Sequence, residues 1–210
     1  MNCRWAGITV ALLVLALSGC ASMSGDECVT GDWAAIGFED GSRGYTSDRI
    51  SGYRKACAKH GVTPDFQAYL RGRDQGLVEF CQPGRGFSLG ANGGQYNGVC
   101  AADREPEFLD AYRAGSELYR LRANVSQANS AIYAKQKQLE ITKDEMRVKE
   151  VALISDETTT EERVVLIADL VDLSERTGEL ESEIEMLIAD RARHEQELEY
   201  YQQTVAMQGY

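Results

Sequence analysis

The residues of this chain with the clearest potential for chemistry are acids and arginines that lie among aromatic side chains in its first half. They are Asp32, Glu39, Asp40 and Asp74, then Arg43, Arg71 and Arg73, and the aromatics Trp33, Phe38 and Tyr45. Aromatic faces combined with charged groups suit a glycan-binding cleft. The pattern gives four possible binding residues: Asp32, Trp33, Asp40 and Arg73. Asp-Gly and Asp-Trp pairs also serve turns and small cores, and that structural interpretation is the stronger one.

Catalytic constellations are weak in this sequence. No spacing fixes two carboxyl groups across a scissile bond, as a glycosidase requires. The glycines from Gly84 to Gly94 are not followed by Lys and Ser or Thr, so they do not form a phosphate-binding loop. His60 lies beside Cys57 near a predicted helix end, where a cation suits the helix dipole. We therefore predict no catalytic residue and no enzyme. The residues nearest to catalytic candidates are Asp32, His60 and Arg73.

The chain opens with a charged start and a short apolar run, which is typical of a secretory signal and too short to span a bilayer comfortably. The run ends in Leu17, Ser18, Gly19 and Cys20, which resembles the lipobox of bacterial lipoproteins. This resemblance implies that residues 1–19 are removed and that Cys20 carries the lipid. Ala21 follows where Asp would favour the inner membrane, so the resemblance implies an outer-membrane anchor facing the periplasm. The alternatives are an ordinary signal peptide and an uncleaved anchor helix.

Cysteine usage agrees with export to an oxidising compartment. Of six cysteines, the lipoprotein interpretation removes Cys3 with the signal and blocks Cys20 with lipid. Four remain for disulfides: Cys28, Cys57, Cys81 and Cys100. Their even number predicts two disulfides, with three possible pairings that the sequence leaves open. The rival is a metal site built from Cys57, His60 and other cysteines, but the spacings lack paired zinc knuckles. We expect no metal and no cofactor.

The mature chain is strongly acidic. The formal net charge is -11 at pH 7, and removal of residues 1–19 takes away Arg4, which leaves -12. Nucleic acid is excluded as a partner because its binding requires a basic footprint. An anionic lipid surface is also a poor partner for the folded chain. The expected membrane contact is therefore the N-terminal lipid.

The composition changes near residue 115. Of the 20 glycines, 16 lie between Gly25 and Gly115, together with all three prolines and the four pairable cysteines. The predicted parts are a lipidated tether at 20–27, a disulfide-stapled, glycine-rich head at 28–115, a helical hairpin at 116–205 and a tail at 206–210.

Short elements are expected within the head. Thr46 or Ser47 can cap a helix that Gly61 ends, and Thr63 with Pro64 predicts the start of a second helix. The segment 81–100 is predicted to be mostly turns and irregular backbone, with one short strand or hairpin at most. A loose echo of Phe66, Tyr69 and Gly72 predicts two helices with similar aromatic packing. The echo consists of Phe108, Tyr112 and Gly115.

The second half carries a coiled-coil pattern. Positions that alternate steps of four and three are Leu166, Leu170, Leu173, Thr177, Leu180, Ile184, Leu187, Arg191, His194, Leu198, Tyr201 and Val205. The upstream segment keeps the same rhythm at Leu118, Leu121, Val125, Ala128, Ile132, Lys135, Leu139, Thr142, Met146, Lys149 and Leu153. Residues 155–160 interrupt the pattern and can cap the second helix. His194 on this seam would face Val125.

Charge decides how these two helices pair. Residues 116–153 carry seven Lys or Arg and five Asp or Glu, whereas residues 161–203 carry four against thirteen. Opposite charges and a short connection favour an antiparallel hairpin, with Ile132 facing Leu187. In that register Glu183 and Asp169 receive the ammonium groups of two seam lysines, Lys135 and Lys149. The alternative is a parallel homodimer through the second helix, which would place acids against acids.

The head also resembles a known family over roughly residues 28–115. The matching residues are Gly31, Asp32, Trp33, Ile36, Gly37, Asp40, Gly41, Gly44, Cys57, Gly61, Tyr69, Gly72, Arg73, Gly76, Leu77, Phe80, Cys81, Pro83, Gly86, Phe87, Gly90, Tyr96, Gly98, Val99 and Cys100. They resemble the domain of unknown function of small proteobacterial envelope lipoproteins, with Phe80 standing where Tyr is expected. The resemblance implies a location and a domain boundary, and it implies no activity.

The sequence therefore predicts a mainly α protein with a small disulfide-stapled, glycine-rich head and a long antiparallel α-helical hairpin. Its expected role is that of a noncatalytic interaction or scaffold protein, lipid-anchored at the outer membrane and facing the periplasm. The hairpin is expected to bind an envelope protein or the cell wall. The alternative is a small periplasmic enzyme or binding module that acts on envelope glycan or peptide.

Overall fold

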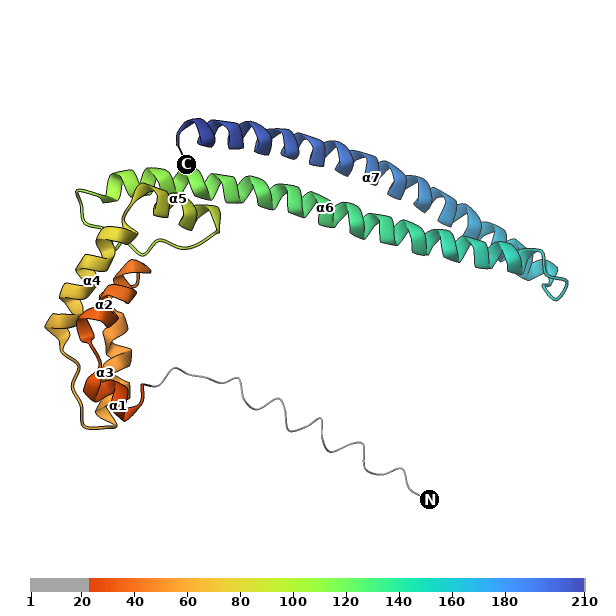
Figure 1. Ribbon diagram of the computed structural model, residues 1–210. Coiled ribbons are helices and arrows are strands. Elements are labelled where there is room, and N and C mark those ends of the chain that lie inside the picture. The colour runs from red at the N-terminus through yellow and green to blue at the C-terminus, as the bar shows by residue number, and fades with distance from the viewer. Residues whose placement is uncertain (1–22, 210) are drawn as a thin grey trace, which may run out of the picture. The chain divides into compact units, whose positions relative to one another are not determined.

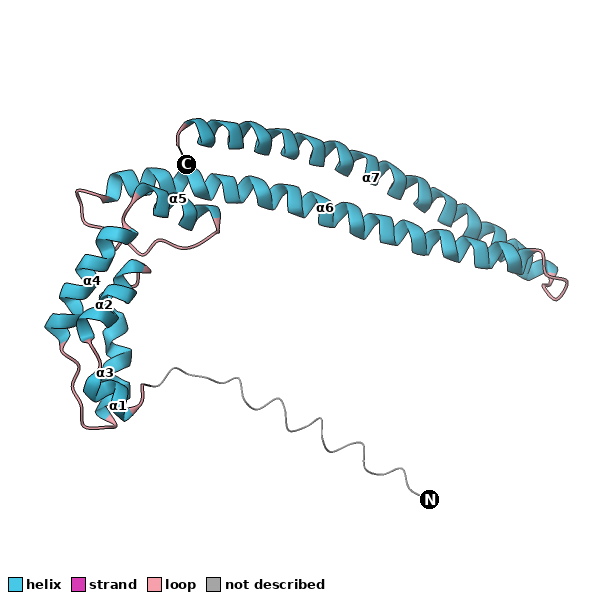
Figure 2. Cartoon of the chain, in the orientation of Figure 1, coloured by secondary structure: helices cyan, strands magenta, loops and turns pink. Residues whose placement is uncertain are grey.

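The computed structural model describes residues 23–209, which fold into helices and connecting loops without any strand (Figures 1 and 2). The predicted signal sequence and Cys20 lie outside these residues. The chain forms two compact units, the first up to Arg85 with Tyr96–Phe108, and the second from Gly86–Gln95 and Leu109 onward. Among the described helices, none is both long and apolar enough to cross a membrane. The mainly α prediction is confirmed.

Short capped helices build the first unit. They are α1 (Gly25–Thr30), α2 (Trp33–Ser42), the 3-10 helix η1 (Ser47–Arg49), α3 (Ile50–Ala58) and α4 (Phe66–Phe80). Asp32 caps α2 by accepting hydrogen bonds from two backbone N–H groups. The prediction that Thr63 and Pro64 start α4 is wrong. Asp65 is the N-cap and accepts from the Ala68 N–H, because Asp is at least as strong a capping residue as Thr.

Glycines bring α2 and α4 into backbone contact. A Cβ on Gly72 would lie 1.8 Å from the carbonyl oxygen of Ala34, and one on Gly37 would lie 2.0 Å from that of Tyr69. One turn further along each helix, the same role falls to Gly41 and Gly76. These spacings of four residues place two glycines on one face of each helix, so no side chain can replace them without moving the helices apart.

The segment 81–100 contains a helix, α5 (Pro83–Ala91), so its prediction as turns and irregular backbone is wrong. Gly90 of α5 and Gly115 of α6 allow these two helices to pack closely within the second unit. A Cβ on Gly90 would lie 2.2 Å from the Tyr112 carbonyl oxygen, and one on Gly115 would lie 2.1 Å from that of Phe87. A glycine in the sequence is compatible both with a turn and with a close helix crossing, so the sequence alone does not distinguish the two.

Both predicted disulfides are present, and the structure pairs them as Cys28 with Cys57 and Cys81 with Cys100. The first bond joins α1 to α3 in a core that also contains Trp33, Ile50 and Tyr69. Because the Cys57 sulfur is bonded to Cys28, it is not available as the metal ligand of the rival interpretation.

The second unit is dominated by two long helices. Helix α6 (Glu105–Leu153) has 49 residues and α7 (Thr160–Met207) has 48. We call their part from Leu109 to Met207 the arm. Every residue of both predicted seams is buried or half-buried. At about 1.5 Å per residue, each helix is roughly 70 Å long. The predicted helical hairpin is confirmed, although α6 begins at Glu105, before the predicted start at residue 116.

We predict that Gly72→Ala weakens the first unit by about 1–3 kcal/mol or more, because the new methyl group overlaps the Ala34 carbonyl. Gly52→Ala is the matched control in α3, where a Cβ meets nothing within 4 Å. That change should stabilise the protein by about 0.5–1 kcal/mol through higher helix propensity. A chain that starts at Ala21 keeps Trp33 as its single tryptophan, so urea titration of its fluorescence measures both effects. Equal stabilities of the two variants would refute the backbone contact.

Candidate functional site

A buried carboxylate, Asp40, lies at the centre of a polar cluster in the first unit. Its side chain is almost inaccessible and accepts hydrogen bonds from Arg49 Nε at 2.9 Å, Tyr53 Oη at 3.1 Å and Tyr69 Oη at 2.9 Å. The donors belong to η1, α3 and α4, whereas Asp40 belongs to α2. One carboxylate therefore ties four elements together, which is the type of satisfied network that makes a buried charge tolerable.

The phenols of this cluster are held in the neutral form. Burial raises the pKa of Tyr69 far above its usual value, and the hydrogen bond to Asp40 raises it further. Burial likewise raises the pKa of Tyr53, against a smaller opposing effect of Arg49. The guanidinium of Arg49 also stacks on the Tyr45 ring, 4.0 Å from its centre. Because the carboxylate already has three donors, its evident role is to position helices.

The structure brings together only part of the predicted binding set. Arg73 is buried on α4, and its Nε donates to the Tyr45 carbonyl oxygen at 3.0 Å. Trp33 packs in the core, 6.1 Å from the Tyr53 ring. Asp32 caps the opposite end of α2 from Asp40, about 12 Å away along the helix axis. Each of the four thus has a structural contact, and a binding role for them stays a prediction.

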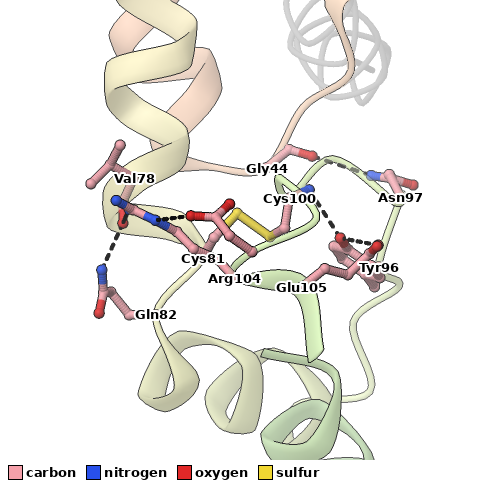
Figure 3. Close-up of a disulfide and its surroundings, with 10 residues drawn as sticks. Gly44, Val78, Cys81, Gln82, Tyr96, Asn97, Cys100, Arg104 and Glu105 are labelled. Atoms are coloured by element: carbon pink, nitrogen blue, oxygen red, sulfur yellow. Dashed lines mark hydrogen bonds and ion pairs between the residues drawn. A yellow bond between two sulfur atoms is a disulfide. The ribbon is translucent and has the colours of Figure 1, made fainter. Parts of the chain in front are cut away.

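Arg73 also lines a hollow of about 360 Å³ beside the Cys81–Cys100 disulfide. Its lining residues include Asp74, Leu77, Val78, Val99, Asp103 and Arg104. Figure 3 shows Arg104 directed at the Val78 carbonyl oxygen and at a neighbouring carboxylate on one side of the disulfide. On the other side, Tyr96 Oη accepts from the Cys100 N–H at 2.9 Å and donates to Glu105 at 2.8 Å. The hollow therefore combines two guanidinium groups, two carboxylates and apolar walls.

The arm offers a different kind of site, an extended protein surface. Lys135 Nζ lies 2.5 Å from Glu183, and Lys149 Nζ lies 2.5 Å from Asp169, so both predicted ion pairs are present. A third pair between the helices joins Lys143 to Glu181 at 2.7 Å. These side chains are about one-third to one-half exposed, so each pair adds only about 0.2–1 kcal/mol. Their main effect is to select one antiparallel register.

Polar residues on the seam complete this selection. Thr177 Oγ1 contacts the sulfur of Met146 at 3.5 Å across the two helices. His194 is half-buried on the seam, and its Nδ1 lies 3.6 Å from the Glu197 carboxylate one turn further on. Near the start of α6, Tyr201 Oη donates to the Ala114 carbonyl oxygen at 3.0 Å. Contacts at both ends and in the middle therefore fix the same pairing.

No pattern in the sequence identifies Arg49, Tyr53 and Tyr69 as partners of Asp40. Their side-chain donors reach the Asp40 carboxylate only after the helices have packed. The spacing of these residues along the chain follows no local periodicity. Arg104 was missed for the same reason, since the Cys81–Cys100 bond brings its loop to α4. The seam lysines were found because helical periodicity is a local signal.

The described chain is thus a helical protein with a disulfide-stapled unit and a coiled-coil arm. Residues 32–117 match a family model described as "Protein of unknown function (DUF2799)". The match runs from the N-cap of α2 into α6, and it confirms a domain of unknown function over nearly the predicted range. No curated protein and no solved structure matches the chain significantly.

We predict that Tyr69→Phe lowers the free energy of unfolding by about 1–3 kcal/mol at pH 7, because Asp40 loses a buried donor. Tyr119→Phe, on the exposed surface of the arm, is the control and should change the free energy of unfolding little.

A raised pKa of Tyr69 in the folded state also means that its contribution to stability is kept below the usual Tyr pKa of 10.0 and lost as the pH rises above it. Urea titrations between pH 7 and 11 should show this loss, and Tyr69→Phe should reduce its slope. A pH-independent stability would contradict the assignment.

We also predict that Ile132→Cys with Leu187→Cys forms a disulfide inside one chain, because the two positions face each other in the observed register. Non-reducing electrophoresis and peptide mapping would detect the bond in a monomer. Ile132→Cys with Leu173→Cys is the out-of-register control, because position 173 lies about 21 Å from position 187, toward the start of α7. Crosslinking only between chains would replace the hairpin with a dimeric coiled coil.

Proposed function

We propose that this protein is a noncatalytic interaction protein of the bacterial envelope, held at the outer membrane by a lipid on Cys20. The single observation that carries the proposal is the arm, two helices of nearly 50 residues that pack along one continuous seam. A hairpin of this length exposes far more surface than its own folding requires. Such a surface suits the recognition of another protein or of the cell wall.

Two further features support the location. The lipobox residues Leu17 to Cys20 precede a chain whose four remaining cysteines form disulfides, as expected in an oxidising compartment. Multiple acyl chains provide stable anchoring without a further apolar segment. The acidic charge of the mature chain disfavours direct contact with anionic lipid, so the lipid anchor is the proposed membrane contact.

A second function has one specific observation in its favour. The hollow beside the Cys81–Cys100 disulfide presents Arg73 and Arg104 with two acids, Asp74 and Asp103. Mixed charges with apolar walls suit a small zwitterionic or peptide ligand, so a binding module for envelope peptide or glycan is the alternative role. The closed network around Asp40 gives this alternative no catalytic base.

We predict that Cys20→Ser releases the protein from the outer membrane into the soluble periplasm or leaves the precursor unprocessed, because the acylated thiol is lost. Membrane fractionation and the mass of the N-terminal peptide measure this directly. In the same cells, an amine-reactive crosslinker should join arm lysines such as Lys137 and Lys143 to another envelope component in the wild type. The yield of this crosslinked product should be lower for Cys20→Ser.

Cys3→Ser is the control for this experiment, since Cys3 belongs to the predicted signal. It should leave fractionation unchanged. Continued sedimentation of Cys20→Ser with membranes at the wild-type N-terminal mass would refute the lipid anchor.

A further inference from the structure

Helix α6 passes into α7 at residues 148–171, which we call the tip (Figure 1). Exposed apolar side chains are concentrated in this segment. Those more than half exposed are Val148, Val151, Ile154, Val164, Val165, Ile167 and Val171. The rest of the described arm also has seven exposed large apolar residues, but they are spread over about three times as many positions. An apolar concentration of this type on a soluble surface marks a docking site more often than an accident.

The folding of the hairpin does not require these residues. The seam at the tip is formed by Lys149, Leu153, Leu166 and Leu170, which are half-buried between the helices. Six of the exposed residues belong to α6 or α7, and the seventh, Ile154, directly follows α6 and is 78% exposed. All seven are Val or Ile, and the six within the helices have branched side chains that make them weaker helix formers than Lys, Arg or Glu. Their exposure to water and their position in helices are therefore both unfavourable for the stability of the isolated chain.

The tip is a fixed structure. Thr159 and Glu162 form a reciprocal capping box at the start of α7, and Thr158 Oγ1 donates to the Ala152 carbonyl oxygen at 2.6 Å. The guanidinium of Arg163 donates to the carbonyl oxygens of Leu153, Ser155 and Thr158. A hollow of about 620 Å³ lies beside this turn, and its lining includes Glu157, Glu161 and Val165.

The charges at the tip identify the chemistry of a partner. Among the described acids of the tip and its border, Asp169 is paired with Lys149, and Glu162 is engaged in the capping box. Those without an ion pair are Glu150, Asp156, Glu157, Glu161 and Asp172. The cations of the tip are already engaged, Lys149 with Asp169 and Arg163 with the turn carbonyls. A contact between the tips of two copies would therefore bring acids against acids with no free cation to offset them. Anionic lipid is disfavoured by the same repulsion.

We infer that the tip docks into a cationic, apolar surface of another envelope protein, with the Val and Ile side chains in contact and the acids facing Lys or Arg. This inference rests on the proposed interaction function and assigns it to a particular part of the arm. The acidic border accelerates and orients association, and the apolar centre supplies the affinity. The partner is thus another protein with a basic border around an apolar groove or helix face.

The test is photocrosslinking in living cells with p-benzoylphenylalanine placed in the full chain at Val151 or Val165, and at Tyr133 as an exposed position in the middle of the arm. The tip positions should give adducts to another protein, whose crosslinked peptides lie within a surface that carries Lys or Arg. Glu157→Lys with Glu161→Lys should reduce these adducts by about tenfold or more, because like charges then face each other. Glu157→Gln with Glu161→Gln should reduce them less. Circular dichroism checks that the exposed substitutions leave the helices intact.

Other outcomes overturn the inference in distinguishable ways. Tip adducts to a second copy of this chain or to lipid would replace the inferred partner. Tip adducts that persist after charge reversal would remove the cationic requirement. Adducts from Tyr133 without any from the tip would move the site along the arm and leave the interaction function standing. The absence of adducts at all three positions would overturn both proposals.

Discussion

The pairing of α6 with α7 is the constraint on which most of the second unit depends. Within the described second unit, no third layer of helices covers most of the arm, so the seam must hold about 70 Å of helix in one register. Apolar residues supply the burial, but a uniform apolar seam tolerates slippage by a heptad. The half-buried lysines at positions 135 and 149 remove this freedom, because each reaches its acid only in the observed alignment. Weak pairs can therefore decide the structure without dominating its energy.

The first unit solves a different problem, the stability of a small core. Its helices α2 and α4 approach so closely that glycine is required at the contact, although glycine lowers helix propensity by about 1 kcal/mol per residue relative to Ala. Close approach gains dense packing around Trp33 and Tyr69. The Cys28–Cys57 bond, which spans 29 residues of sequence, offsets part of the remaining loss by restricting the unfolded chain. The Asp40 network then fixes the ends of the helices.

How far the sequence could predict the structure depended on how local each signal was. The 4–3 rhythm and the charge difference between the two halves predicted the hairpin, its direction and two specific ion pairs. The pairing of the cysteines and the partners of Asp40 could not be predicted, because both depend on contacts between distant segments. Helix α5 is not predictable from its glycines, because residues such as Gly86 and Gly90 are as typical of turns as of close helix crossings. The recurrence of Tyr69 and Gly72 as Tyr112 and Gly115 did indicate a second close helix contact, because Gly72 and Gly115 both lie where two helices cross.

The rigid turn gives the apolar tip its physical significance. A flexible loop with the same side chains would lose conformational entropy on binding, and that loss would offset much of the gain from burying them. Here the entropy is already lost in folding, since Arg163 and the capping box restrain the turn through hydrogen bonds within the chain. The Val and Ile side chains add to this effect because their χ1 rotamers are restricted in helices. The same features that lower helix propensity at the tip thus reduce the entropic penalty of docking.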